Sequence, residues 1–320
     1  MPPARHHDMR TSPAHAGSAR RGRVVGLGLC VVDHVYVVDS DDFGAERLRY
    51  RERLVSFGGM VANALAQAAA LGCEAHILSQ VGDDAEGRML RSALTRAGLV
   101  TRRLRSRKGH ATGLAVMLVD RGSGARRFLV ADRRPFEHGA ADFDLGPLRE
   151  DCVLLVDGHF PAQARRALRR ARALGARVVA DFNQPTPAAL SLMRWVDYPV
   201  VPFEFARAYG GTDPAVTLRR LRDDYGGEGV VTAGERGGFY LEGDRLVRYP
   251  ALRARVRDTT GAGDAFHGAF AAALCHGADL SAAIAEGARA GARCCGALGA
   301  TGHLQAPEQH WVGARRQGSR

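Results

Sequence analysis

The fold of this sequence follows from one stretch, Asp258-Thr-Thr-Gly-Ala-Gly-Asp264, and from the run behind it, Ala265-Phe-His-Gly-Ala-Phe-Ala-Ala-Ala-Leu274. A turn of small residues leads directly into an alanine-rich apolar run that ends at Gly277, which predicts a buried helix. The first N–H groups of a helix lack partners within it, and the positive end of the helix dipole lies there. Glycines let an anion approach this backbone closely. The stretch therefore predicts an anion site suited to a phosphoryl group.

Asp264 falls in the first turn of the predicted helix, beside the anion site. A carboxylate in this position can accept the proton of an attacking hydroxyl group. It can equally be a helix cap, with glycines that only make a tight turn. On this segment alone, both interpretations stay open.

A second glycine turn, Gly58-Gly59-Met-Val-Ala-Asn63, opens another alanine-rich run that ends at Gly72. The glycine backbone and the Asn63 amide can hydrogen-bond vicinal hydroxyl groups. Taken alone, this segment is better explained as a turn and a packed helix. Asp33 ends the first apolar run, at the strand edge where open α/β sheets bind ligands, although it can also be an ordinary loop aspartate.

Short β-branched runs alternate with longer alanine-rich runs along the body of the chain. This rhythm predicts an α/β fold with a mostly parallel central sheet between two layers of helices. The predicted strands are Val24–Cys30, Ala75–Val81, Val153–Val156, Arg177–Ala180 and Val230–Thr232. The predicted helices are Ala62–Leu71, Ala85–Ala97 and Ala162–Leu174.

Two segments, at about 35–57 and 112–130, have strand-like runs but no helix of their own. We expect them to pair into a small β-sheet that covers one edge of the main domain as a lid. Arg126 and Arg127 in the second segment could meet an anionic group, but exposed surface arginines are the simpler interpretation.

The two glycine turns, with Asn63 and Asp264, resemble the two signature motifs of the ribokinase-like (PfkB) carbohydrate kinase family, in the family's order and about 200 residues apart. Gly82-Asp-Asp-Ala-Glu-Gly87 and Val231-Thr-Ala-Gly-Glu-Arg-Gly-Gly238 are similar to two further segments of that family. The resemblance implies one ribokinase-like three-layer α/β/α domain over residues 24–307, with the small sheet as its lid.

The resemblance also implies transfer of the γ-phosphoryl group of ATP to a sugar hydroxyl, with Mg²⁺. Such a reaction depends on positioning and charge stabilisation. The implied general base is Asp264, and the implied anion hole is Gly261, Ala262 and Gly263. The implied sugar contacts are Asp33, Gly59, Asn63 and His159. The implied nucleotide contacts are Thr232, Gly234, Gly237 and Thr260.

Some positions depart from the family pattern. Where members carry an Asn-x-x-Glu motif for Mg²⁺, this chain has Phe203 and Ala206, which leaves Glu204 to act through water. Met60 stands where ribose-specific members tend to have lysine, which argues against ribose. The Phe-His-Gly run at His267 favours a ketohexose or fructose-like substrate. The family's monovalent-cation loop, a K⁺ site, would use Asp258 and Thr260.

Other functions explain the sequence less well. A dinucleotide oxidoreductase needs a third glycine after Gly26 and Gly28, but Val31 occupies that position. A nucleoside kinase of the same family would share every motif. A non-catalytic sugar- or nucleotide-binding regulator would be expected to lack the base.

The chain has 320 residues, 46% of them apolar and 25% charged, which excludes a disordered chain or a small disulfide scaffold. Of the net charge of +11, five arginines and one aspartate in residues 1–23 give +4, and three arginines in residues 313–320 give +3. The body therefore keeps only +4, so we expect no nucleic-acid partner. Residues 1–23 are expected to be a disordered basic tail, and residues 308–320 a C-terminal tail.

No apolar run is long enough to cross a membrane, and no secretory signal opens the chain, so we expect no membrane partner. The six cysteines include no C-x-x-C pair, which favours free thiols and a cytoplasmic location. The edges of the expected lid sheet predict a homodimer through the lid.

Overall fold

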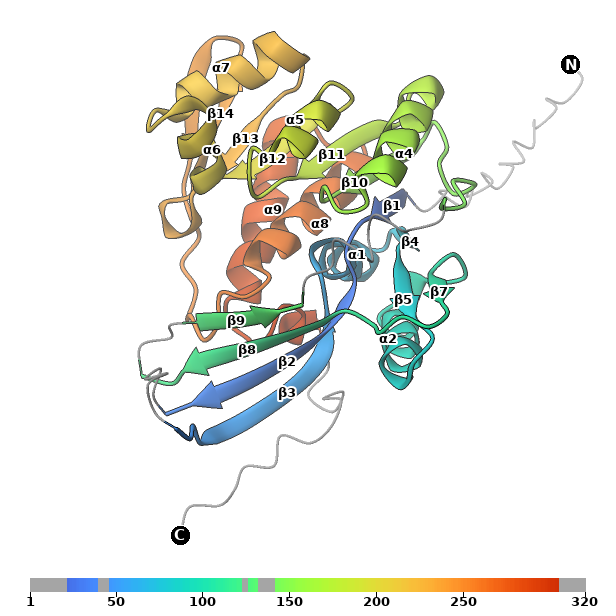
Figure 1. Ribbon diagram of the computed structural model, residues 1–320. Coiled ribbons are helices and arrows are strands. Elements are labelled where there is room, and N and C mark those ends of the chain that lie inside the picture. Colours follow the sequence, from blue (N-terminus) through green and yellow to red (C-terminus); the bar gives the residue numbers. More distant parts are fainter. Residues whose placement is uncertain (1–21, 40–45, 123–125, 132–141, 305–320) are drawn as a thin grey trace, which may run out of the picture.

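The structure is a computed structural model that describes residues 22–39, 46–122, 126–131 and 142–304. Of the tail expected over residues 1–23, it describes only Gly22 and Arg23, and residues 308–320 lie outside it. Helices cover both faces of a large sheet, and a small sheet stands apart from that layer (Figure 1). The predicted α/β architecture with a small additional sheet is therefore confirmed.

The large sheet contains nine strands among the described residues. Neighbouring strands are parallel from β13 to β6, and β14 and β15 add an antiparallel edge. In spatial order they are β15 (Arg245–Tyr249), β14 (Gly238–Glu242), β13 (Val230–Thr232), β12 (Tyr198–Pro202), β11 (Arg177–Asp181), β10 (Cys152–Val156), β1 (Arg23–Leu27), β4 (Glu74–Leu78) and β6 (Leu99–Val100).

The apolar runs form these strands because both faces of the sheet are covered. In β10, Val153 and Leu155 face one helix layer, while Leu154 and Val156 face the other, and all four are fully buried. Burying each such side chain contributes about 1.5–3 kcal/mol. The first layer is α1 (Met60–Ala70), α2 (Ala85–Arg96), α8 (Ala262–Cys275) and α9 (Leu280–Cys294). The second is α4 (Pro161–Leu174), α5 (Pro187–Met193), α6 (Phe203–Gly210) and α7 (Pro214–Tyr225).

The small sheet has the order β3 (Tyr50–Gly58), β2 (Val31–Val38), β8 (Leu114–Asp120) and β9 (Arg126–Val130). Strands β2 and β8 are parallel, and the two outer pairs are antiparallel. Its buried face, which includes Val35, Met117 and Val119, packs on Leu298, which follows α9. The two segments predicted to pair therefore do pair, although β2 begins at Val31, soon after β1.

Two predicted strands are shorter than expected. The strand predicted over Val24–Cys30 ends at Leu27, because the carboxylate of Asp157 accepts a hydrogen bond from the Leu29 amide at 2.7 Å. The strand predicted over Ala75–Val81 is wrong as a single element. It is divided at Ser79, whose hydroxyl donates to the Gly28 carbonyl at 2.6 Å. Its second part, β5 (Gln80–Gly82), pairs with β7 (Arg105–Arg107).

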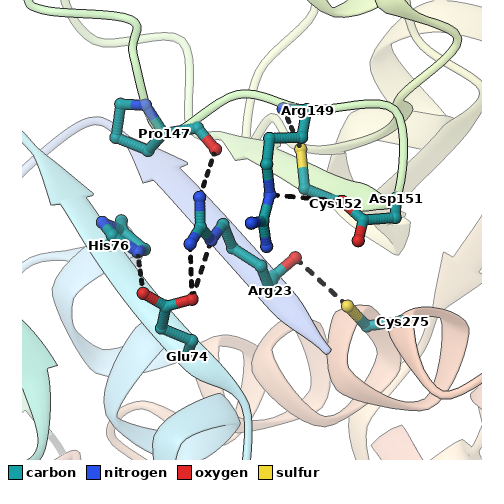
Figure 2. A network of polar contacts seen from close by, with 8 residues as sticks. All are labelled: Arg23, Glu74, His76, Pro147, Arg149, Asp151, Cys152 and Cys275. Atoms are coloured by element: carbon teal, nitrogen blue, oxygen red, sulfur yellow. Dashed lines mark hydrogen bonds and ion pairs between the residues drawn. The ribbon is translucent and has the colours of Figure 1, made fainter. Parts of the chain in front are cut away.

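A polar network ties the amino end of β1 to its surroundings (Figure 2). The Arg23 guanidinium donates two hydrogen bonds to Glu74 of β4, at 2.6 and 2.9 Å, and a third to the Pro147 carbonyl. The Cys275 thiol of α8 donates to the Arg23 carbonyl. His76 lies 2.9 Å from the other Glu74 oxygen. This network lies at the amino ends of β1 and β4, opposite to the carboxyl ends of the strands.

Across the described residues, every helix is too short or too polar to span a lipid bilayer.

Candidate active site

The two helices that begin at the predicted glycine turns, α1 and α8, pack against each other. Gly268 of α8 lies against the backbone of α1, since a Cβ there would overlap the Ala64 carbonyl. This close approach brings the first turns of both helices together. The Asn63 amide then donates a hydrogen bond to the Asp264 carboxylate at 2.8 Å. The structure therefore joins the two motifs at one point.

The predicted anion hole lies at the start of α8. Gly261 is the N-cap with φ of +74°, and a Cβ there would overlap Ala300, so both backbone and space require glycine. Gly263, two residues on, is exposed and has no atom within 4 Å of the position of a Cβ. The Ala262 amide donates to the Thr259 carbonyl at 3.3 Å, and Gly263 borders open space at the positive end of the helix.

The loop before this hole is fixed by Asp258, which is buried. One carboxylate oxygen accepts the Thr260 amide at 2.9 Å and the Thr260 hydroxyl at 2.6 Å, and the other accepts the Gly299 amide at 2.9 Å. The buried Cys294 thiol lies 3.3 Å from the carbonyl oxygens of both Thr260 and Ala300. Burial raises the pKa of this thiol to about 12. The hole is therefore held in place from two sides.

Asp264 has the electrostatics of a general base. Burial and the nearby Asp181 carboxylate raise its pKa to about 7, and Asp157 adds to the rise. The hydrogen bond from Asn63 acts in the opposite direction. A carboxylate with a pKa near neutral pH accepts a proton more readily than an ordinary aspartate.

His267 lies one turn after Asp264 and is buried. Its Nδ1 is 2.8 Å from the Gly263 carbonyl and 3.4 Å from Asp181 Oδ2, and its Nε2 is 3.0 Å from the Val200 carbonyl of β12. Burial lowers the pKa of His267, while the contacts to the two carbonyls raise it. Because both ring nitrogens are engaged within the protein, His267 fixes α8 against β11 and β12.

Two of the predicted sugar contacts, Asp33 and Gly59, lie at the glycine turn that opens α1. Asp33 of β2 and Gly58 of β3 touch, since a Cβ on Gly58 would overlap the Asp33 carboxylate. Gly59 has φ of +97° and lies against the Leu29 carbonyl, where a Cβ would not fit. The Asn183 amide, after β11, lies 3.4 Å from the Met60 sulfur. Asp33 is thus placed against the glycine turn that opens α1.

His159 lies in a tightly wound loop after β10. Gly158 has φ of +83°, and Phe160 is the one described non-glycine residue with positive φ, at +54°. Phe160 is fully buried and packs edge-on against Phe143. The His159 amide donates to the Asp157 carboxylate at 3.0 Å. Strained backbone of this kind persists where a site holds it in place, and it keeps His159 at the carboxyl edge of the sheet.

Three predicted nucleotide contacts lie at the end of β13. Thr232 ends the strand, and Gly234 begins a short 3-10 helix, η1 (Gly234–Arg236). Gly237 has φ of +80°, and a Cβ there would overlap the Tyr249 carbonyl. The fourth, Thr260, lies beside the anion hole instead. No hydrogen bond between described residues joins Thr232, Gly234 or Gly237 to Asp264.

Glu204 lies exposed in the first turn of α6, directly after β12. The Arg236 guanidinium stacks over the neighbouring Phe203 ring, at 4.6 Å from its centroid. Among the described residues, no three His, Cys, Asp or Glu side chains group as a metal site. The water-mediated contact of Glu204 to Mg²⁺ stays a prediction, since Mg²⁺ takes few protein ligands when phosphates supply the others.

Two site residues were missed by the sequence analysis. Asp157 and Asp181 follow the buried runs of β10 and β11 directly, as Asp33 follows its own apolar run. Burial and Asp157 raise the pKa of Asp181 well above its ordinary value, and His159 lowers it. The signal that could have found them is an acidic residue at the carboxyl end of a buried strand.

Comparison with known families gives a match over most of the chain. A family model described as pfkB family carbohydrate kinase matches residues 21–307. The chain belongs to the pfkB family of carbohydrate kinases. Both the resemblance stated from the motifs and the predicted enzyme class are thereby confirmed.

Several known proteins are similar to this pfkB family chain over most of its length. The ribokinase of Bacillus subtilis (strain 168) is 24% identical over 278 residues, which cover 87% of this chain and 94% of that protein. A ribokinase-type protein from Agrobacterium tumefaciens has a crystal structure that superimposes with a TM-score of 0.81, at 27% identity over 88% of this chain and 94% of that one. Arabidopsis thaliana ribokinase, in complex with ribose and ATP, gives a TM-score of 0.74 at 20% identity, covering 88% and 95%.

Proposed function

We propose that this carbohydrate kinase transfers the γ-phosphoryl group of ATP to a hydroxyl group of a sugar. The observation that carries the proposal is the hydrogen bond between Asn63 and Asp264 beside the start of α8. This contact supports the proposal because it joins a carboxylate in the first turn of α8, which can accept a proton, to an amide that can bind hydroxyl groups.

In the proposed reaction, Asp33, Gly59, Asn63 and His159 hold the sugar. Asp264 takes the proton of the attacking hydroxyl, which its raised pKa favours. The amides of Gly261, Ala262 and Gly263 stabilise the charge of the phosphoryl group in transfer. The small sheet acts as a lid that excludes water and so limits hydrolysis of ATP.

The nucleotide is bound by Thr232, Gly234, Gly237 and Thr260. Support for ATP comes from the similar fold of Arabidopsis ribokinase, whose complex contains ATP. Mg²⁺, when bound, neutralises charge on the phosphates, and Glu204 reaches it through water. Asp258 and Thr260 form the loop of a K⁺ site, where the Asp258 carboxylate keeps lone pairs beyond its hydrogen bonds.

The sugar is a ketohexose or a fructose-like compound. Met60, in place of lysine, lines the rim of the site with a thioether rather than a charge. A nucleoside kinase is the second candidate, because it would use the same base and anion hole. A non-catalytic sugar- or nucleotide-binding regulator is the candidate from another class, and the retained Asp264 argues against it.

Two further properties belong to the proposal. The edge strand β9 has Phe128, Leu129 and Val130 more than half exposed, so it fits a homodimer formed through the lid. All six cysteines are free, which fits a reducing, cytoplasmic environment.

The test is turnover of ATP to ADP on a panel of ketohexoses, aldoses, sugar acids and nucleosides, with Asp264→Asn as the control. We expect turnover on one ketohexose that falls at least about 10³-fold in the variant, while calorimetry shows unchanged ATP binding. Turnover only on nucleosides would establish the second candidate. Near-normal turnover in Asp264→Asn would overturn the role of the base.

A further inference from the structure

Arg126, the first residue of β9, links the small sheet to the anion hole. Its guanidinium donates a hydrogen bond to the Thr260 hydroxyl at 3.1 Å, across 134 residues of sequence. Thr260 directly precedes Gly261, the N-cap of α8. The positive charge of Arg126 therefore lies at the entrance of the hole, although the residue belongs to another sheet.

The register of the small sheet orients Arg126 toward the hole. Arg126 pairs with Val119 of β8, and directly paired residues lie on the same face. Val119 and Met117 are buried on the face that packs on the body of the protein. The Met117 sulfur lies 3.3 Å from the same Thr260 hydroxyl. Arg127, the next residue, extends from the opposite face.

The charge of Arg126 is available for an anion. Among the described residues, no carboxylate lies within ion-pair distance of it, and its hydrogen bond is to a neutral hydroxyl. Arg126 and Gly263 are both exposed, and the space in front of Gly263 is open. A guanidinium has five N–H donors in a planar fork that matches phosphoryl oxygens, so four donors besides the one to Thr260 are left for a ligand.

We propose that Arg126 is a catalytic residue that contacts the phosphoryl group in transfer. This inference rests on the proposed function. The sugar oxygen forms a bond to the γ-phosphorus, the bond from that phosphorus to the bridging oxygen of ATP breaks, and the electron pair leaves with ADP. The hydroxyl proton goes to Asp264. Arg126 stays protonated throughout and stabilises the equatorial phosphoryl oxygens, so catalysis requires the small sheet to be in place.

The first experiment compares Arg126→Gln with Arg127→Gln, which removes the same charge from the other face of the strand. We expect kcat to fall about 10²- to 10³-fold in Arg126→Gln, with the KM for sugar within about threefold. Arg127→Gln should keep kcat within about twofold. Added guanidinium should restore part of the kcat of Arg126→Ala. A raised KM without a loss of kcat, or no rescue, would show that Arg126 only tethers the lid.

A second measurement does not depend on the identity of the sugar. Calorimetry gives the Kd of ADP and of a non-hydrolysable ATP analogue for the wild type and Arg126→Gln. We expect the variant to weaken binding of the triphosphate at least about tenfold more than binding of ADP. An equal effect on the binding of both nucleotides would overturn the role of Arg126. If the wild type turned over none of the substrates in the panel, only the proposed function would be overturned.

Discussion

Asn63 and Asp264 are 201 residues apart in sequence and 2.8 Å apart in the structure. Asn63 donates, so it stabilises the ionised form of Asp264 against the burial and the neighbouring carboxylates that disfavour it. The base is thereby kept poised between its two protonation states near neutral pH.

Replacing Asn63 should change the pH dependence of the reaction. Asn63→Ala removes a donor to the charged carboxylate, so the pKa of Asp264 rises above about 7. The acid limb of log kcat/KM against pH should move upward by about one pH unit. Gln67→Ala is the control, because Gln67 is a buried amide of the same helix that bonds His303 instead. A limb that moves equally in both variants would contradict the role of Asn63.

Gly263→Ala should separate folding from catalysis. The added methyl group meets no atom within 4 Å, and alanine favours a helix by up to about 1 kcal/mol over glycine. The melting temperature should therefore stay equal or rise. The methyl group would stand where the phosphoryl group is proposed to bind, so kcat should fall on the order of 100-fold. A variant as active as the wild type would place the phosphoryl group elsewhere.

Gly58→Ala should weaken sugar binding through Asp33. A Cβ at Gly58 overlaps the Asp33 carboxylate, which must move away. Loss of hydrogen bonds to a charged group costs about 1.5–3 kcal/mol, or about ten- to a hundredfold in KM for the sugar. Gly72→Ala adds the same methyl group at the far end of α1, in open space at φ of +89°, and should lower only stability. KM measured for both variants decides whether Asp33 contacts the sugar.

Glu74→Gln should lower stability at neutral pH only. Burial would raise the pKa of Glu74, but the hydrogen bonds from Arg23 and His76 hold it below its ordinary value. The pKa of Glu74 is therefore lower in the folded protein than in the unfolded chain, where it is about 4.3. Glu74 contributes its full stabilisation at pH values above the unfolded pKa, and this contribution is lost as the pH falls through the folded pKa. Because Glu74 is about one-third exposed, we expect only about 1 kcal/mol at pH 7.

Urea denaturation at pH 7 and near pH 3 measures this difference. Glu286→Gln is the control, since Glu286 and Arg289 form an exposed pair of the same 2.6 Å length. That variant should change the free energy of unfolding by less than about 0.5 kcal/mol. Equal losses in both variants would show that the Arg23 network adds nothing to a surface ion pair.

The sequence predicted those parts of the fold that depend on local pattern. The helices after Gly59 and Gly261 were expected because a glycine turn precedes an alanine-rich run, and β10 because Val153–Val156 is entirely apolar. The division of the predicted strand at Ser79 was not visible, because a hydroxyl bond to Gly28, 51 residues away, determines it.

The site itself could be predicted only in part. Asp264 and Asn63 were found from their glycine turns, but their contact depends on how closely Gly268 lets α8 approach Ala64. Asp181 ends a run that is typical of a core strand, so the sequence analysis did not identify its buried carboxyl group. Arg126 and Arg127 look alike in sequence, and only the register of β9 against β8 separates them.

The buried Cys294 thiol can serve as a built-in chemical probe of local unfolding. While the carbonyls of Thr260 and Ala300 enclose it, its high pKa and burial keep it unreactive. An alkylating reagent can modify it only during moments when the two loops separate. The rate at which Cys294 is alkylated therefore reports how often the loops around the anion hole open.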